Sequence, residues 1–227
     1  MGIESQLSWL RRLNRISSSD LDSDWRDINY CAIDLETTGL DFERDEIISI
    51  GAVQIQSSRV ITEANYYCEV RPSQMPSPSS IRIHGIRAVD LETASPIEVV
   101  LPEFAEKLRG RVVVAHAAWV ENAFLKDRLE GMNIDFSKRL IDTAGLARTC
   151  EVVEVDLDSE PSLEFLARTL NLPAYSPHHA LGDALTTAII FLALSTELER
   201  RRIEKGGSIL TLRELLKLSE KSARTQW

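Results

Sequence analysis

Asp34 and Glu36 stand two positions apart at the end of an apolar run, within the segment CAIDLETTGL. Side chains at positions i and i+2 of a strand point to the same face, so these two carboxylates should lie close together. Like charges at that separation repel each other and raise each other's pKa. We therefore expect a bound cation that offsets the repulsion or, since acids are common near turns, an exposed acidic turn.

Two other segments each place a histidine five residues before an acid. His116 precedes Glu121 in VVVAHAAWVENAFL, and His178 precedes Asp183 in PHHALGDAL. An acid in the first turn of a helix, such as Glu121, is stabilised by the helix dipole by roughly 0.3–1 kcal/mol without any metal. Asp183 falls in an otherwise apolar helix, where an unpaired carboxylate is costly. The second pair is therefore the stronger indication of chemistry.

These three segments can meet at one edge of a sheet, where ligands bind outside the carboxyl ends of the strands. Four carboxylates gathered there indicate a divalent metal, and donors that are all oxygen suit Mg²⁺ or Mn²⁺ better than zinc. A fourth segment, IRIHGI, contains His84 before a glycine. Taken alone, this histidine is typical of a structural or capping residue.

Periodicity predicts an α/β domain around these segments. Two β-rich runs separated by residues 56–58 indicate an antiparallel hairpin, and short apolar strands then alternate with helices. The helix at 97 is expected to begin with a capping box formed by Ser95 and Glu98, and the proline-rich stretch 71–80 to be a loop. We expect a mixed five-stranded sheet flanked by helices, with strands at 28–36, 46–55, 59–70, 111–116 and 139–142 and helices at 97–108, 121–131, 143–149, 163–170, 181–200 and from 211 onward.

Charge, cysteine content and hydropathy narrow the classes of function. A net charge of −9 makes the chain unsuited to coating long duplex DNA by phosphate contacts alone, although metals could let it bind a nucleic-acid end. The 3 cysteines match no zinc spacing and indicate reduced thiols in a cytoplasmic protein. We recognise no secretory signal and no apolar run near the roughly 18 residues of a membrane helix, so we expect no membrane partner.

The segments DLETTG, AHAAWVENAFL and HHALGDA resemble, in order and form, the three motifs of the DEDDh exonuclease family. That family includes the proofreading epsilon subunit of bacterial DNA polymerase III, RNase T and oligoribonuclease. DTAGLAR and IHGI also resemble segments of the epsilon-like branch. The resemblance covers residues 28–195 and implies an RNase H-like fold with metal-dependent 3′→5′ removal of nucleotides.

The resemblance implies roles for individual residues. Asp34, Glu36, Glu121 and Asp183 match the four acids that hold two Mg²⁺ or Mn²⁺ ions. His178 matches the general base, and His179 occupies a position that is usually not catalytic. The substrate-binding residues implied are Thr37, Thr38, Gly39, Leu40, His84 and His116.

We expect from this resemblance a 3′–5′ exonuclease that releases nucleoside monophosphates by two-metal hydrolysis, with DNA favoured over RNA. Its expected partner is a single-stranded nucleic-acid 3′ end, and candidate further partners are a polymerase or a second copy of the chain. The expected organisation is an N-terminal helix and linker at 1–24, the exonuclease domain at 25–200 and a C-terminal helical extension at 201–227.

The second motif departs from the family pattern. Glu121 stands where the family usually has Asp, and Ala117 stands where it often has Asn. The longer side chain of Glu121 could bind its metal through water, which favours a slow or metal-selective enzyme. This departure leaves open a non-catalytic module that holds a 3′ end or a polymerase. A metal-dependent phosphoesterase that acts on small molecules is a further alternative, because its chemistry would use the same acids.

Overall fold

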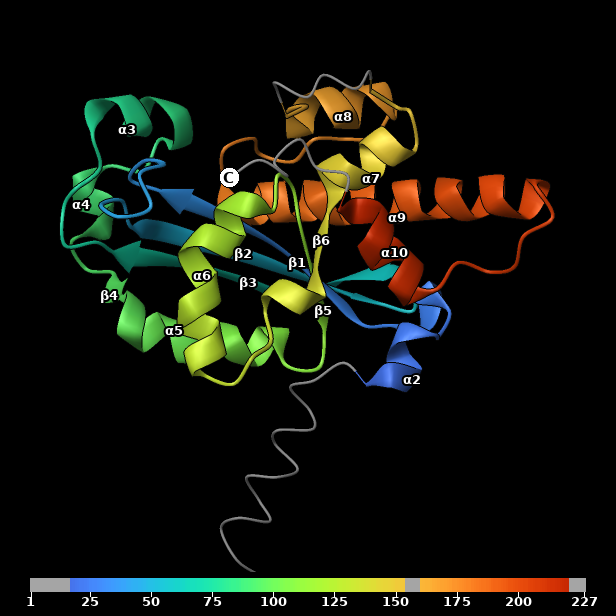
Figure 1. Cartoon of the computed structure of the whole chain (residues 1–227). Helices are drawn as coiled ribbons and strands as arrows, with labels where there is room; N and C mark the ends of the chain where they lie inside the picture. Colours follow the sequence, from blue (N-terminus) through green and yellow to red (C-terminus); the bar gives the residue numbers. More distant parts are fainter. Residues whose placement is uncertain (1–16, 154–159, 221–227) are drawn as a thin grey trace, which may run out of the picture.

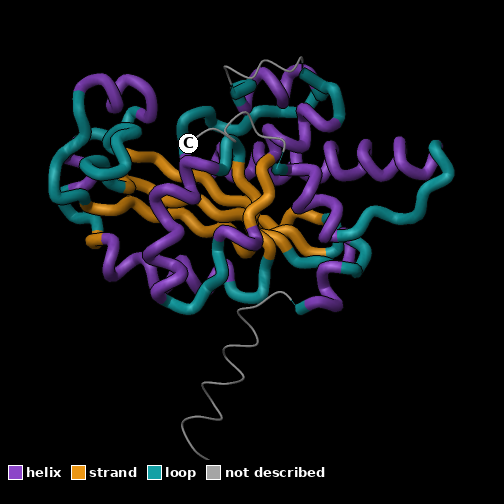
Figure 2. Tube along the Cα trace, in the orientation of Figure 1, coloured by secondary structure: helices purple, strands orange, loops and turns teal. Residues whose placement is uncertain are grey.

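A six-stranded sheet with helices on both faces forms the centre of the computed structural model, which describes residues 17–153 and 160–220 (Figures 1 and 2). The strand order is β4-β3-β2-β1-β5-β6. The strands are β1 (Tyr30–Thr37), β2 (Ile47–Gln56), β3 (Arg59–Arg71), β4 (Ser95–Pro96), β5 (Val112–Ala115) and β6 (Leu140–Asp142).

The first three strands form an antiparallel meander, and β5 and β6 continue the sheet parallel to β1. Ser57 and Ser58 have φ angles of 48° and 57°, which is the left-handed backbone that a two-residue hairpin needs. The expected number of five strands is wrong by one. Ser95 and Pro96 do not form a capping box but pair parallel with the end of β3 as β4.

Helices cover both faces of the sheet, which explains why β1 reads as a nearly continuous apolar run. One face carries α7 (Thr143–Thr149), α8 (Leu163–Thr169), α9 (Ala180–Glu204) and α10 (Leu212–Ser219), and the other carries α5 (Ile97–Leu108) and α6 (Trp119–Gly131). The shorter helices are α2 (Ser18–Leu21), η1 (Trp25–Asp27), α3 (Pro78–His84), α4 (Ala88–Leu91) and η2 (Ser137–Arg139). Two apolar cores result, one on each side of the sheet.

The long helix α9 lies along the sheet and contacts β1 and β2 (Figure 1). Within the described ranges it is the one helix that is long and apolar enough to cross a membrane, with a mean hydropathy of 1.4 over 18 residues. From the sequence we expected no apolar run of this length, and that expectation is wrong, because α9 has the length and composition of a membrane-spanning helix. Since 56% of that window is buried inside the protein, α9 has the character of a core helix.

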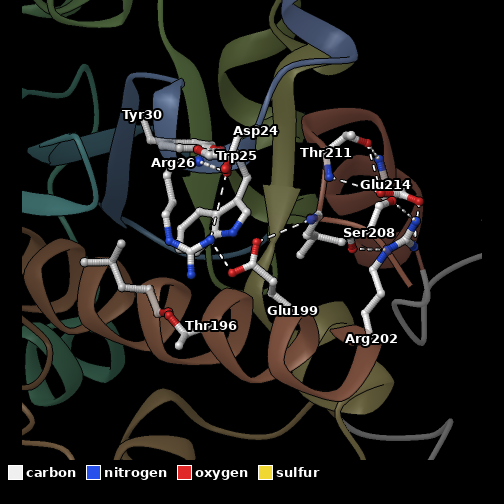
Figure 3. A network of polar contacts seen from close by, with 12 residues as sticks. Asp24, Trp25, Arg26, Tyr30, Thr196, Glu199, Arg202, Ser208, Thr211 and Glu214 are labelled. Atoms are coloured by element: carbon white, nitrogen blue, oxygen red, sulfur yellow. Dashed lines mark hydrogen bonds and ion pairs between the residues drawn. The ribbon is translucent and has the colours of Figure 1, made fainter. Parts of the chain in front are cut away.

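A polar network joins the carboxyl end of α9 to the segment before β1 (Figure 3). The side chain of Glu199 is 7% exposed and forms an ion pair with Arg26. It also accepts a hydrogen bond from the backbone N–H of Leu210 at 3.3 Å. The adjacent Trp25 is 1% exposed and packs edge-on against Phe191, with ring centroids 6.0 Å apart.

The expected division at residue 200 falls inside α9, which continues without a break to Glu204. The helix expected around Leu7, Leu10 and Leu13 lies outside the described residues. A β-bridge between Asp24 and Thr211 brings the first and last described elements together. The three-part organisation of the chain stays a prediction.

Candidate active site

Three of the four predicted acids meet at the carboxyl end of β1. Asp34 and Glu36 project from β1 toward α9, and Asp183 projects from the first turn of that helix (Figure 1 shows the two elements side by side). One ligand oxygen from each of the three carboxylates lies within 4.8 Å of the other two. The side-chain spacing on β1 and the position on α9 thus bring together residues that are almost 150 positions apart in sequence.

Gly51 permits this approach of helix and sheet. It is the residue of β2 that pairs with Asp34, on the face that α9 covers. A Cβ atom at Gly51 would lie 2.1 Å from the carbonyl oxygen of Ala180, far inside van der Waals contact. The first turn of α9 therefore rests directly on the backbone of β2, which carries Asp183 to the two acids of β1.

Glu121 lies beside this group in the first turn of α6. Its residue is 3% exposed, and its Oε2 atom has no hydrogen-bond partner among the described residues. It falls outside the set of three acids whose oxygens lie within 4.8 Å, yet among the neighbouring charges it contributes the largest repulsion to the charge on Asp34. The loop that delivers it is strained, since Ala117 has a φ of 50°.

Burial, followed by repulsion from neighbouring acids, raises the pKa of every acid in the cluster. Burial raises the pKa of Glu36 to about 7, with a contribution from Asp183, and raises that of Asp183 itself to about 6. Burial likewise raises the pKa of Glu121 to about 8. The pKa of Asp34 rises well above its ordinary value, first by burial and then through Glu121, Asp183 and Glu36.

This environment fits a divalent cation. The donors are all carboxylate oxygens, as Mg²⁺ and Mn²⁺ prefer. The charged groups that act on Asp34 are all other carboxylates, so among the described residues no basic side chain neutralises it. The unpartnered Oε2 of Glu121 supplies a further donor.

His178 stands beside the cluster, at the turn that leads into α9. Its backbone is left-handed, with a φ of 59°, and its N–H donates a hydrogen bond to Oδ2 of Asp183 at 2.8 Å. Its side chain is 54% exposed, and Nε2 lies 3.7 Å from Oε1 of Glu164 on α8. Glu164 was not predicted, because an acid near the start of a helix carries no signal of a contact with a loop fourteen residues later.

His116 is held by the protein on both sides of its ring. Nε2 lies 2.7 Å from the carbonyl oxygen of Pro161, so Nε2 carries the proton. Nδ1 lies 2.9 Å from the hydroxyl of Thr143, which can donate to it in the neutral ring. Burial lowers the pKa of His116 and outweighs the nearby Asp142, which keeps the ring neutral. Its predicted role in substrate binding stays a prediction, and a contact would have to use the ring carbons.

His84 is the last residue of α3. Its Nδ1 accepts a hydrogen bond from the N–H of Ile86 at 3.0 Å, while Nε2 is buried and has no partner among the described residues. Burial lowers its pKa, and nearby His178 lowers it further. The electrostatic effect of His178 on His84 indicates that the end of α3 lies near the turn before α9. The role of His84 in substrate binding stays a prediction.

The loop after β1 contains the remaining predicted substrate residues. The hydroxyl of Thr37 donates to the carbonyl of Gly39 at 2.7 Å, and that of Thr38 donates to Oδ1 of Asp45 at 2.7 Å. A Cβ atom at Gly39 would lie 2.4 Å from Oδ2 of Asp45. The close approach that Gly39 permits is therefore made to Asp45 in this structure. Leu40 is 59% exposed, as a residue that contacts terminal bases would be.

The tip of the same loop packs on α6. Phe42 meets Trp119 edge-on at a centroid distance of 5.6 Å and Phe124 at 5.3 Å. This aromatic contact connects the loop that follows Asp34 and Glu36 to the helix that carries Glu121.

Residues 31–191 match the profile of the RNase T exonuclease family. The chain belongs to this family. The match begins in the strand that carries Asp34 and ends in the helix that carries Asp183, so it includes all four acids and His178.

Two curated relatives of this exonuclease-family chain are similar over most of its length. A PolC-type DNA polymerase III from Thermotoga petrophila is 34% identical over 202 residues, which are 88% of this chain and 14% of the relative. A DNA polymerase III subunit epsilon-like protein from Rhodobacter capsulatus is 33% identical over 189 residues, 81% of this chain and 26% of the relative. The chain thus spans only a small part of these relatives.

Solved exonuclease structures share the fold. Exonuclease X in complex with 5′-overhanging duplex DNA superposes with a TM-score of 0.60 at 22% identity, covering 84% of this chain and 99% of the other. This similarity confirms that the exonuclease-family chain has an RNase H-like fold.

Proposed function

We propose that this protein is a metal-dependent 3′–5′ exonuclease that releases nucleoside monophosphates from nucleic-acid 3′ ends. The observation that supports this most directly is the meeting of Asp34, Glu36 and Asp183, with ligand oxygens within 4.8 Å of one another. Family membership supports the same reaction class. Asp34, Glu36 and Asp183 would hold the cations, two Mg²⁺ or Mn²⁺ ions, with Glu121 as the adjacent fourth donor.

When bound, divalent ions neutralise charge on the attacking and leaving oxygens and acidify the attacking water. His178 accepts the proton of that water at an imidazole nitrogen, as histidines that act as general bases do. The exposed position of its ring leaves it room to turn from Glu164 toward the acids. His84 and the loop from Thr37 to Leu40 bind the terminal nucleotides.

DNA is the proposed substrate in preference to RNA. The relatives at 33–34% identity are named as DNA polymerase III proteins, which supports a DNA 3′ end and a polymerase as a partner. The three cysteines are all free thiols, which supports the proposed cytoplasmic location.

A non-catalytic module that holds a 3′ end is the second candidate, because Glu121 replaces the usual Asp. The buried position of Glu121 next to Asp34 favours the enzyme, since an acid retained there without a metal would only add repulsion. A phosphoesterase for small molecules would use the same acids, and only the substrate distinguishes it.

The deciding experiment is digestion of a short 5′-labelled single strand with Mn²⁺, comparing the natural chain with Asp34→Asn. A ladder of shortened products from the natural chain alone supports the exonuclease. Retained label together with a measurable Kd supports the binding module. Parallel reactions with duplex DNA, short RNA and a small phosphodiester test the substrate, and cleavage of the small phosphodiester alone would support the phosphoesterase.

A further inference from the structure

Three residues form a row across the sheet on the face that α9 covers. Asp34 of β1 pairs with Gly51 of β2, and Gly51 pairs with Tyr67 of β3. Directly paired residues of antiparallel strands point to the same face. Tyr67 therefore stands on the same side of the sheet as the acidic cluster, one strand beyond the glycine on which α9 rests.

The ring of Tyr67 contacts the residue that begins α9. Because Gly51 has no side chain, the first turn of the helix crosses the sheet at this point, and His179 comes to lie over β3. The rings of Tyr67 and His179 are stacked, with centroids 4.5 Å apart and an angle of 22° between their planes. Tyr67 is partly buried, whereas His179 is exposed and caps the helix without a side-chain hydrogen bond.

The other contacts of the turn that presents His178 are made within the turn, with α9 and with α8. On its amino side, the backbone N–H of Tyr175 donates to the hydroxyl of Thr186 at 2.9 Å. His178 itself is attached through its backbone N–H to Asp183, and its exposed ring approaches Glu164 at 3.7 Å. The stack on Tyr67 immediately follows His178 and joins this turn to β3 through side chains, next to the backbone contact of Ala180 with Gly51.

We propose that Tyr67 is a positioning residue for the exonuclease reaction: its ring holds His179 and thereby fixes the turn from which His178 faces the acidic cluster. The expected effect of Tyr67 on the reaction rate rests on the proposed exonuclease function. Tyr67 acts through His179 and needs no contact with the nucleic acid. An aromatic stack of this kind can shift the population of a two-state turn by roughly three- to ten-fold.

Nuclear magnetic resonance of the full chain tests the contact without any activity. The chain has only 4 histidines, so single substitutions assign every ring signal. We expect the ring current of Tyr67 to move the His179 ring protons upfield, and Tyr67→Leu to remove this shift and move the His178 signals as well. Tyr67→Phe should keep both sets of signals near their original positions, because it keeps the ring.

Kinetics with a short single strand then test the effect on the reaction. Tyr67→Leu should lower kcat roughly three- to ten-fold with little change in KM, and Tyr67→Phe should recover most of that loss. Tyr67→Leu combined with His179→Ala should be no slower than the slower single variant, since both remove the same contact.

Tyr66→Leu is the matched control. Tyr66 is the preceding residue of β3, points to the opposite face and stacks on Phe104 at 6.2 Å. Its substitution should lower the melting temperature and leave kcat and the histidine signals unchanged below that temperature. The proposal is overturned if Tyr67→Leu leaves the His178 signals and kcat unchanged, or if Tyr66→Leu lowers kcat equally. An inactive natural chain with the expected histidine shifts would instead contradict the proposed function alone.

Discussion

The backbone N–H of His178 donates a hydrogen bond to Oδ2 of Asp183 at 2.8 Å. This bond joins the proposed general base to a proposed metal ligand within a single turn of the chain. A shift of the turn therefore displaces both groups together, and substitutions in it should affect proton transfer and metal binding at once.

Neutralising one acid should abolish digestion without unfolding the protein. In Asp34→Asn we expect no Mn²⁺-dependent product, because the amide donates in place of a carboxylate oxygen. The melting temperature in EDTA should stay the same or rise, since Asp34 is repelled by three neighbouring acids. Calorimetry and the labelled-strand assay check both results, and retained digestion by the folded variant would contradict the proposed site.

The two adjacent histidines should differ in importance. His178→Ala should lower kcat roughly 10²–10⁴-fold, the usual contribution of a general base. His179→Ala should cost at most about ten-fold, because it removes only the stack on Tyr67. Single-turnover rates measure both, and a larger loss in His179→Ala would reverse the assignment.

The stability of the metal-free protein should depend on pH through the acidic cluster. Folding raises the pKa of Asp183 to about 6, of Glu36 to about 7 and of Glu121 to about 8. Acids of the unfolded chain titrate near about pH 4, so the folded state binds more protons above that pH. This contribution is fully present below about pH 4 and is lost as the pH rises through about 6 to 8.

We therefore expect the melting temperature in EDTA to fall progressively between about pH 4 and about pH 8, and Mn²⁺ to restore it most at the higher pH. Glu121→Gln should reduce the slope, because it removes a group whose pKa burial raises to about 8. If the melting temperature in EDTA changes with pH equally in the natural chain and in this variant, Glu121 is not a buried acid with a raised pKa.

Adding one methyl group at Gly51 should disturb both fold and activity. Gly51→Ala places a Cβ 2.1 Å from the carbonyl of Ala180, so α9 must move away from the sheet and carry Asp183 with it. We expect a loss of at least about 1–3 kcal/mol in the free energy of unfolding, as in other overpacked cores, and a weaker affinity for Mn²⁺. Gly131→Ala is the matched control, since no atom lies within 4 Å of a Cβ there.

Relieving the strained backbone before α6 should stabilise the protein. Ala117 has a φ of 50°, and Asn adopts this conformation more readily than Ala. Ala117→Asn should raise the free energy of unfolding by roughly 0.5–1 kcal/mol, and Ala117→Val should lower it. Denaturant titrations measure both free energies of unfolding. Equal effects of the two substitutions would show that the left-handed backbone of residue 117 does not determine the change in stability.

The acids could be located from the sequence because the signals that mark them lie within short segments of the chain. Asp34 and Glu36 share a face by strand geometry alone, and Asp183 was conspicuous as a charge in an apolar helix. The preference for Asn at position 117 within the family now has a physical reason in the left-handed backbone. Glu121 was recognised, but its burial next to Asp34 depends on how α6 packs against the sheet.

Other features depended on contacts that no local pattern contains. Gly51 sits in a β-rich run and looks like any small strand residue until α9 is placed on it. Ser95 has the spacing of a capping residue but pairs with β3, where the sheet offers it backbone partners. We expected a loop over residues 71–80, but its last residues belong to α3, which begins at Pro78. The hydroxyl of Ser77 caps the start of this helix.

The edge-on contact of Phe42 with Trp119 gives the molecule an optical reporter next to the acids. Trp25 lies at the opposite end of the sheet, beside the network of Glu199. In a background where Trp9 and Trp227 are replaced by Phe, emission would arise from these two indoles alone. Quenching or a spectral shift confined to Trp119 on addition of an oligonucleotide would then register movement of the loop that bears Leu40, in real time and without a label.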